Sequence, residues 1–134
     1  MSIRVLIIDP DTLFLQEASE HLLLHGYAVA TAAGGEEGLR CFRDFAPAVV
    51  VTELLMPDKD GIECLLEIKR AAPHTRVLAV SAGQGILKSD FVLSLAVKLG
   101  ADAVLKKPFA LAQLAHAIQA IWPEGTAPPL PKIR

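Results

Sequence analysis

Short, uninterrupted apolar runs recur along this chain, and each is followed by a segment with helical periodicity. The clearest are Val5-Leu6-Ile7-Ile8 near the start and Ala48-Val49-Val50-Val51 further along. A strand with one face in water alternates apolar and polar side chains, whereas a continuous apolar run indicates a strand that is covered on both faces. The pattern therefore favours a parallel sheet with helices packed on each side.

Five such strands and five helices can be placed along the sequence. Parallel strands need a long crossover between them, and each helix supplies one, so the alternation predicts an α/β fold with a doubly wound, five-stranded parallel sheet. Asp11 is placed to cap the first helix, which ends at His25-Gly26, and Gly100 ends the fourth. The expected strands cover residues 4–8, 27–31, 48–52, 76–81 and 103–106, and the expected helices cover residues 12–25, 36–45, 62–72, 86–99 and 110–121.

One domain, residues 1–122, accounts for all of these elements. The remaining segment, residues 123–134, contains Pro123, Pro128, Pro129 and Pro131. Proline has no backbone N–H to donate within a helix, so we expect an extended, partly polyproline-like tail.

Composition excludes several classes of function. The formal net charge is −2, and the 13 Lys and Arg residues are scattered, so we expect no nucleic-acid partner. No apolar run is long enough to span a bilayer, and the first residues lack a secretion signal, so we expect a cytoplasmic protein without a membrane partner. Cys41 and Cys64 lie in helical patterns without metal-ligand spacing, which indicates reduced, packed thiols.

Four polar side chains stand where predicted strands end. Asp9 follows the first strand, Glu53 the third, Ser81 ends the fourth, and Lys107 follows the fifth. The carboxyl ends of parallel strands open on one edge of the sheet, where open α/β folds keep their binding sites. We therefore expect these four residues to meet in one crevice.

The sequence from Ser2 to Trp122 resembles the response-regulator receiver domain, which has a flavodoxin-like fold. The resemblance implies a phosphorylatable aspartate, a Mg²⁺ ion held by acidic residues, a lysine that neutralises the phosphoryl oxygens, and a hydroxyl that moves toward them. The matching segments are Ile7-Ile8-Asp9, Met56-Pro57, Asp60-Gly61, Val80-Ser81-Ala82, Gly100-Ala101 and Lys107-Pro108-Phe109.

Two positions depart from that family's pattern. Glu53 stands where the family has the aspartate that accepts the phosphoryl group, and Pro10 stands where it has a second acid that binds the metal. The resemblance leaves Asp9, Glu53 and the Leu55 carbonyl as metal ligands. Mg²⁺ demands near-ideal oxygen geometry, so we expect no resident cofactor and at most weak Mg²⁺ binding.

The extra methylene of Glu53 has two expected effects. It moves the carboxylate into the space that a phosphoryl group needs, and it brings that carboxylate toward Lys107. Phosphoryl transfer depends on positioning, so a displacement of this kind is costly. We expect a Glu53–Lys107 pair that either imitates the phosphorylated state or holds the crevice closed.

These observations predict a non-enzymatic signalling module, degenerate in phosphorylation, that acts by protein–protein interaction. The alternative is a working phosphorelay receiver that binds Mg²⁺ and takes phosphate on Glu53. A flavodoxin-like ligand binder is remote, because Asp9-Pro10-Asp11 would repel the phosphate of a flavin. A small hydrolase would lack both a metal and a base. Val104 stands where many receivers have an aromatic ring, which puts the relay of a signal in doubt.

The fourth helix suggests a partner surface. At 100° per residue, Asp90, Ser94 and Lys98 share one narrow polar face, and most of the remaining surface is apolar. We expect Phe91 or Leu95 to be exposed and to contact a protein partner or a second copy through the face formed by the fourth and fifth helices. A histidine kinase is a further candidate partner.

Overall fold

A sheet of five parallel strands, in the order β2-β1-β3-β4-β7, forms the centre of the computed structural model, which describes residues 2–122. The strands are β1 (Arg4–Ile8), β2 (Ala28–Ala32), β3 (Val49–Glu53), β4 (Arg76–Ser81) and β7 (Ala103–Lys106), and a separate hairpin joins β5 (Gly83–Gln84) to β6 (Leu87–Lys88). The helices are α1 (Thr12–Leu24), α2 (Gly35–Phe45), α3 (Gly61–Ala71), α4 (Ser89–Lys98) and α5 (Leu111–Ile121). None of the helices within residues 2–122 is long and apolar enough to cross a membrane.

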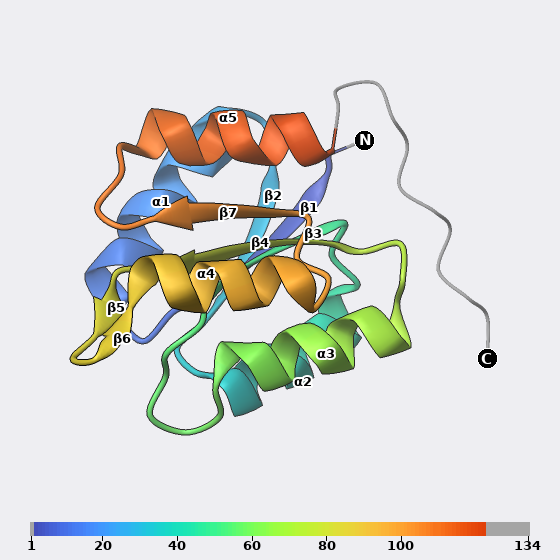
Figure 1. The fold of residues 1–134 in the computed structure, drawn as a ribbon. Helices are drawn as coiled ribbons and strands as arrows, with labels where there is room; N and C mark the ends of the chain where they lie inside the picture. The colour runs from blue at the N-terminus through green and yellow to red at the C-terminus, as the bar shows by residue number, and fades with distance from the viewer. Residues whose placement is uncertain (1, 123–134) are drawn as a thin grey trace.

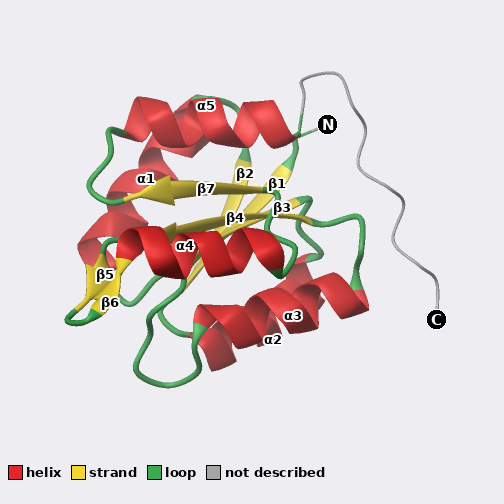
Figure 2. Ribbon diagram, in the orientation of Figure 1, coloured by secondary structure: helices red, strands yellow, loops and turns green. Residues whose placement is uncertain are grey.

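The helices cover both faces of the sheet (Figures 1 and 2). Side chains alternate along each strand, so β1 sends Val5 and Ile7 to the face under α1 and α5, and it sends Leu6 and Ile8 to the face under α2, α3 and α4. All four are fully buried. The continuous apolar runs are therefore explained by two cores, one on each side of the sheet, and the doubly wound α/β fold is confirmed.

Carboxylates cap the first turns of three helices. Asp11 accepts hydrogen bonds from the backbone N–H groups of Leu13 and Phe14 at the start of α1, and Asp60 accepts one from Glu63 at the start of α3. These side chains satisfy N–H groups that have no partner within the helix. The predicted role of Asp11 as a helix cap is confirmed.

The third capping carboxylate is Asp58, which lies in the loop after β3 and caps the start of α2. Its Oδ1 accepts from Gly35 N at 3.1 Å and its Oδ2 from Glu36 N at 3.0 Å, so the loop after β3 is tied to the first turn of α2. The hydrogen bonds from the Glu36, Lys59 and Gly35 backbone lower the pKa of Asp58 to about 2. This link holds the loop that follows Glu53 in a fixed position against α2.

The predicted elements agree with the structure to about one residue, except before α4. We expected a helix from residue 86, but residues 83–88 form the β5–β6 hairpin and α4 begins at Ser89. Gly83 and Gly85, with φ angles of +79° and +57°, allow the chain to turn back, so that Leu87 and Lys88 pair with Gln84 and Gly83 instead of starting the helix. A Cβ atom at Gly83 would also lie 2.5 Å from the Leu87 carbonyl oxygen. The expected tail at residues 123–134 lies outside the described residues.

Candidate functional site

The sheet register brings the four predicted residues to one edge. Ile8 pairs with Thr52, so Asp9, the residue after β1, lies beside Glu53, the last residue of β3. Glu53 pairs with Val80, and Ser81 pairs with Lys106, which places Ser81 and Lys107 at the same edge on β4 and β7. Parallel pairing therefore brings the four expected residues together at the carboxyl ends of the strands.

Lys107 lies at the centre of this crevice. Its Nζ donates to Asp9 Oδ2 at 2.7 Å and to Glu53 Oε1 at 2.9 Å. The ammonium also lies 5.0 Å from the centroid of the Phe14 ring, and Phe109 packs edge-on against that ring. The predicted Glu53–Lys107 pair is confirmed, and Asp9 and the aromatic ring of Phe14 complete the surroundings of the lysine.

Glu53 is hydrogen-bonded through both of its oxygens. While Oε1 faces Lys107, Oε2 accepts from the backbone N–H of Leu54 at 2.8 Å and of Leu55 at 3.1 Å. The carboxylate is buried, with a residue exposure of 7 %. The Glu53 side chain, which is longer than that of an aspartate, thus folds back on its own loop. Its carboxylate takes up the N–H groups of Leu54 and Leu55, which could otherwise donate to a bound anion.

Burial and pairing act in opposite directions on the charges here. Burial raises the pKa of Asp9 above its ordinary value, and the hydrogen bond from Lys107 offsets this only in part. Burial disfavours the charged form of Lys107, but the hydrogen bonds to Asp9 and Glu53 outweigh it, so the pKa of Lys107 is raised. The lysine therefore stays protonated and neutralises part of the charge of two buried carboxylates.

Few side-chain oxygens at this edge of the sheet are available as ligands for a divalent cation. Asp9 and Glu53 supply carboxylate oxygens of the kind that Mg²⁺ prefers, but both are paired with Lys107. Pro10 supplies no side-chain oxygen, and Asp11 is engaged as the α1 cap. Within residues 2–122, no three His, Cys, Asp or Glu side chains form a metal-binding group. Mg²⁺ is compatible with the two carboxylates but would have to displace the ammonium.

Ser81 lies at the same edge, but its hydroxyl is directed to the hairpin. The side chain is buried, and its Oγ accepts from the backbone N–H of Gly83 at 3.1 Å. Val104 is half-buried on β7 and packs against the core under α4. Sequence reasoning placed Ser81 at the edge correctly, but it did not identify Gly83 as its partner.

Phe14 is the residue of the site that sequence reasoning missed. It lies in the first turn of α1, five residues after Asp9, and the sequence pattern assigns it only to the apolar stripe of that helix. A signal was available, because a helix that starts immediately after a strand carries its first turn over the strand's carboxyl end. An aromatic residue there is close to any cation in the crevice.

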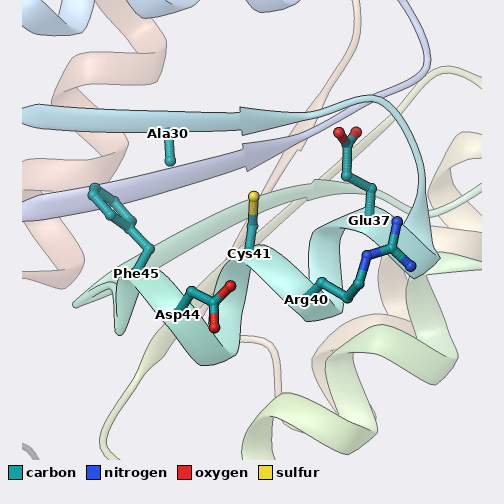
Figure 3. Close-up of a pocket in the computed structure, with 6 residues that line it drawn as sticks. All are labelled: Ala30, Glu37, Arg40, Cys41, Asp44 and Phe45. Carbon is teal, nitrogen blue, oxygen red and sulfur yellow. The ribbon is translucent and has the colours of Figure 1, made fainter.

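A shallow pocket beside β2 is separate from the crevice (Figure 3). It is lined by Ala30, Glu37, Arg40, Cys41, Asp44 and Phe45, from the outer strand β2 and from α2. The Cys41 thiol lies 3.9 Å from the Thr31 carbonyl oxygen, and the second thiol, Cys64, is buried in the core. Both cysteines are free, as the sequence predicts.

The hairpin and α4 carry an exposed apolar patch. Ile86 at the tip of the hairpin is 94 % exposed and Phe91 on α4 is 62 % exposed, with Leu87 and Leu95 completing the patch. Val92, Leu93 and Ala96 turn inward from α4 to the core. The predicted exposure of Phe91 and Leu95 is confirmed.

Comparison with known proteins identifies a family of the same architecture. The family model for the response regulator receiver domain matches residues 5–119. The probable C4-dicarboxylate response regulator DctR of Bacillus subtilis is 34% identical over 119 residues, which are 87% of this chain and 50% of that protein. The transcriptional regulatory protein PrrA of Mycobacterium tuberculosis is 34% identical over 118 residues, 88% of this chain and 49% of that protein. The chain thus spans about half the length of these curated relatives.

Solved structures of receiver domains have the same fold as this chain. A response regulator receiver domain protein from Clostridium thermocellum superposes with a TM-score of 0.80 at 34% identity, covering 89% of this chain and 93% of that one. The BeF3-activated DrrB receiver domain superposes with a TM-score of 0.79 at 27% identity, covering 90% of this chain and 97% of that one.

The central position of Lys107 gives a prediction for stability. We expect Lys107→Ala to lower the free energy of unfolding at pH 7 by about 3 kcal/mol, because two buried carboxylates lose their counter-ion. The loss should shrink toward pH 4. The pKa of Asp9 is already raised in the folded native chain, and in the variant without Lys107 it rises further. A raised folded pKa stabilises the fold at low pH, where the Asp9 carboxyl is protonated, and this contribution is lost as the pH rises through that pKa. Urea unfolding across this pH range measures both effects.

Lys106→Ala is the matched control. Its ammonium lies 3.5 Å from exposed Asp90, and its side chain is 62 % exposed. An exposed pair of this kind contributes less than about 0.5 kcal/mol, with little pH dependence. Equal losses in the two variants would contradict the assignment of Lys107 as the central ion of the crevice.

Proposed function

The chain belongs to the response regulator receiver domain family, and from that premise we propose that it is a signalling module whose phosphoryl-transfer chemistry is disabled and which acts through protein contacts. One observation carries the proposal. Glu53, at the position of the phosphoacceptor, is held by Lys107 on one oxygen and by the N–H groups of Leu54 and Leu55 on the other.

An incoming phosphoryl group would meet three obstacles in this crevice. The acceptor oxygen would have to leave its hydrogen bonds, the lysine would have to be shared between Asp9, Glu53 and the phosphoryl oxygens, and Pro10 offers no metal ligand. Phosphoryl transfer is fast when the reacting groups are well positioned and the phosphoryl charge is neutralised. Here the lysine and the backbone N–H groups that could do this are already bonded to Glu53. We propose that the domain catalyses no turnover of its own and carries a permanent charge where the phosphorylated form of a working receiver carries a transient one.

The working receiver remains the second candidate function. It is favoured by Lys107 and Ser81, which stand at the edge in the positions expected for neutralising and binding phosphoryl oxygens. In this candidate, Mg²⁺ would be held by Asp9, Glu53 and the Leu55 carbonyl, and a histidine kinase would be the phosphoryl source.

The output surface in our proposal is the apolar patch of Ile86, Leu87, Phe91 and Leu95, on the β5–β6 hairpin and the adjoining α4. Contiguous exposed apolar side chains of this size mark association sites on soluble domains. We propose that this patch takes a protein partner or a second copy of the chain.

Treatment with a small phosphodonor at millimolar Mg²⁺ tests the disabled chemistry. Intact mass spectrometry should show no stable gain of one phosphate, while the DrrB receiver domain, which has been solved in a BeF3-activated form, serves as positive control. A clear gain on the native chain that disappears in Glu53→Gln would replace our proposal with the working receiver.

Two substitutions should restore the chemistry. Pro10→Asp adds a carboxylate oxygen for the metal, and Glu53→Asp shortens the acceptor by one methylene and frees the Leu54 and Leu55 donors. We expect the double variant to bind Mg²⁺ and to gain phosphate, with each single variant gaining less, because metal and acceptor act as one unit. Isothermal titration calorimetry follows Mg²⁺ binding, and intact mass follows phosphate. A folded but inert double variant would show that another feature disables the crevice.

The patch is tested by Phe91→Glu, which places a charge at its centre. If a second copy occupies the patch, analytical ultracentrifugation should show concentration-dependent association of the native chain that this substitution abolishes. Val97→Glu is the control, since Val97 is 51 % exposed on the same helix but roughly 120° around its axis. Equal loss in both variants would argue against a specific patch, and a strictly monomeric native chain would leave a different protein as the partner.

A further inference from the structure

A second cavity lies at the opposite edge of the sheet from the crevice. It has a volume of about 570 Å³ between α1 and α5, and three of its lining residues are histidines, His21, His25 and His116. The helix α1 starts beside Asp9 and has 13 residues, so its last turn lies about 20 Å from the crevice. Nothing in the receiver-like site uses these imidazoles.

The hydrogen bond of His25 fixes which of its nitrogens is free. Nδ1 lies 2.9 Å from the backbone carbonyl oxygen of His21, and a carbonyl can only accept, so Nδ1 carries the proton. In the neutral ring, Nε2 then holds a lone pair. Metal-binding histidines commonly show this arrangement, in which a backbone carbonyl orients the ring through one nitrogen and leaves the other for the ion.

His21, the second histidine of the pair, also has a ring nitrogen without a partner within the described residues. Its Nε2 is buried and has no hydrogen-bond partner within the described residues, which is a costly state for a polar atom. His21 lies in the last turn of α1 and His25 is its C-cap, four residues later, so the two rings lie on one side of the helix end. Their centroids lie 4.4 Å apart with an angle of 36° between the ring planes. Two imidazoles with uncommitted nitrogens are thus held next to each other.

We propose that His21 and His25 form a two-histidine site for a late first-row divalent cation of the Zn²⁺, Ni²⁺ or Cu²⁺ class. Imidazole nitrogen suits these ions, and affinity rises toward Cu²⁺, whereas Mg²⁺ prefers oxygen ligands. The described residues hold no preformed group of three ligands, so water completes the coordination, with His116 on α5 facing the same cavity. The ion would satisfy His21 Nε2, and it would leave the cap formed by His25 intact because that cap uses only Nδ1.

Equilibrium dialysis of the tag-free chain against Ni²⁺ tests the site. We expect one ion per chain, with affinity reduced about tenfold or more in His21→Gln and in His25→Gln. His74→Gln is the matched control, since His74 is an exposed histidine in the turn before β4, and Cys41→Ser controls for capture by the partly exposed thiol. Both controls should bind as the native chain does. Binding that survives the loss of both His21 and His25, or that is lost equally in His74→Gln, overturns the proposal.

A second measurement needs no substitution and so does not depend on whether a variant folds. Cu²⁺ added at well below one equivalent should broaden the imidazole proton resonances of His21 and His25 first, and those of His74 last, because paramagnetic broadening falls steeply with distance from the ion. Uniform broadening of all four histidines, or first broadening at His74, would show surface scavenging by single imidazoles and would overturn the paired site.

Discussion

The ammonium of Lys107, held between two buried carboxylates, is the interaction on which the carboxyl edge of this domain depends. Its partners Asp9 and Glu53 lie 98 and 54 residues away in the sequence, and they meet only because β1, β3 and β7 are parallel members of one sheet. Buried carboxylates are tolerated when they are paired and hydrogen-bonded, and each oxygen of both residues has a donor here. The crevice is therefore a satisfied polar network, not an open charged pocket.

The side chain of Glu53 is one methylene longer than an aspartate at the same position would be, and it lies against a closely packed loop. The loop after β3 is tight: Gly61 N donates to the Leu54 carbonyl at 2.8 Å, and a Cβ atom at Gly61 would come within 2.2 Å of the Glu53 carbonyl oxygen. A loop held this closely cannot move away from a longer side chain. Glu53 instead turns back and accepts from Leu54 and Leu55, and the loop's own donors become part of the network.

The crevice is also joined to the surface patch by a short covalent path. Ser81 ends β4, its hydroxyl accepts from Gly83 at the base of the hairpin, and Ile86 stands at the hairpin tip immediately before α4. The antiparallel pairs Gly83–Lys88 and Gln84–Leu87 make this segment a defined structure.

The periodic and local features of this fold could be predicted from the sequence alone. Continuous apolar runs such as Val5–Ile8 predicted buried parallel strands, Asp11 predicted a helix start, and the polar residues after strands predicted which side chains share an edge, because these signals depend on neighbours only a few residues away. The pairing of particular atoms became visible only in three dimensions: Lys107 donates to Asp9 as well as to Glu53, Phe14 lies beside its ammonium, and Asp58 caps a helix more than twenty residues earlier. The structure also has a hairpin where the apolar pattern favoured a helical start at residue 86, since Gly83 and Gly85 with positive φ turn the chain back on itself and residues 87–88 pair with 83–84. Such choices depend on distances between segments remote in sequence, and no local pattern encodes those distances.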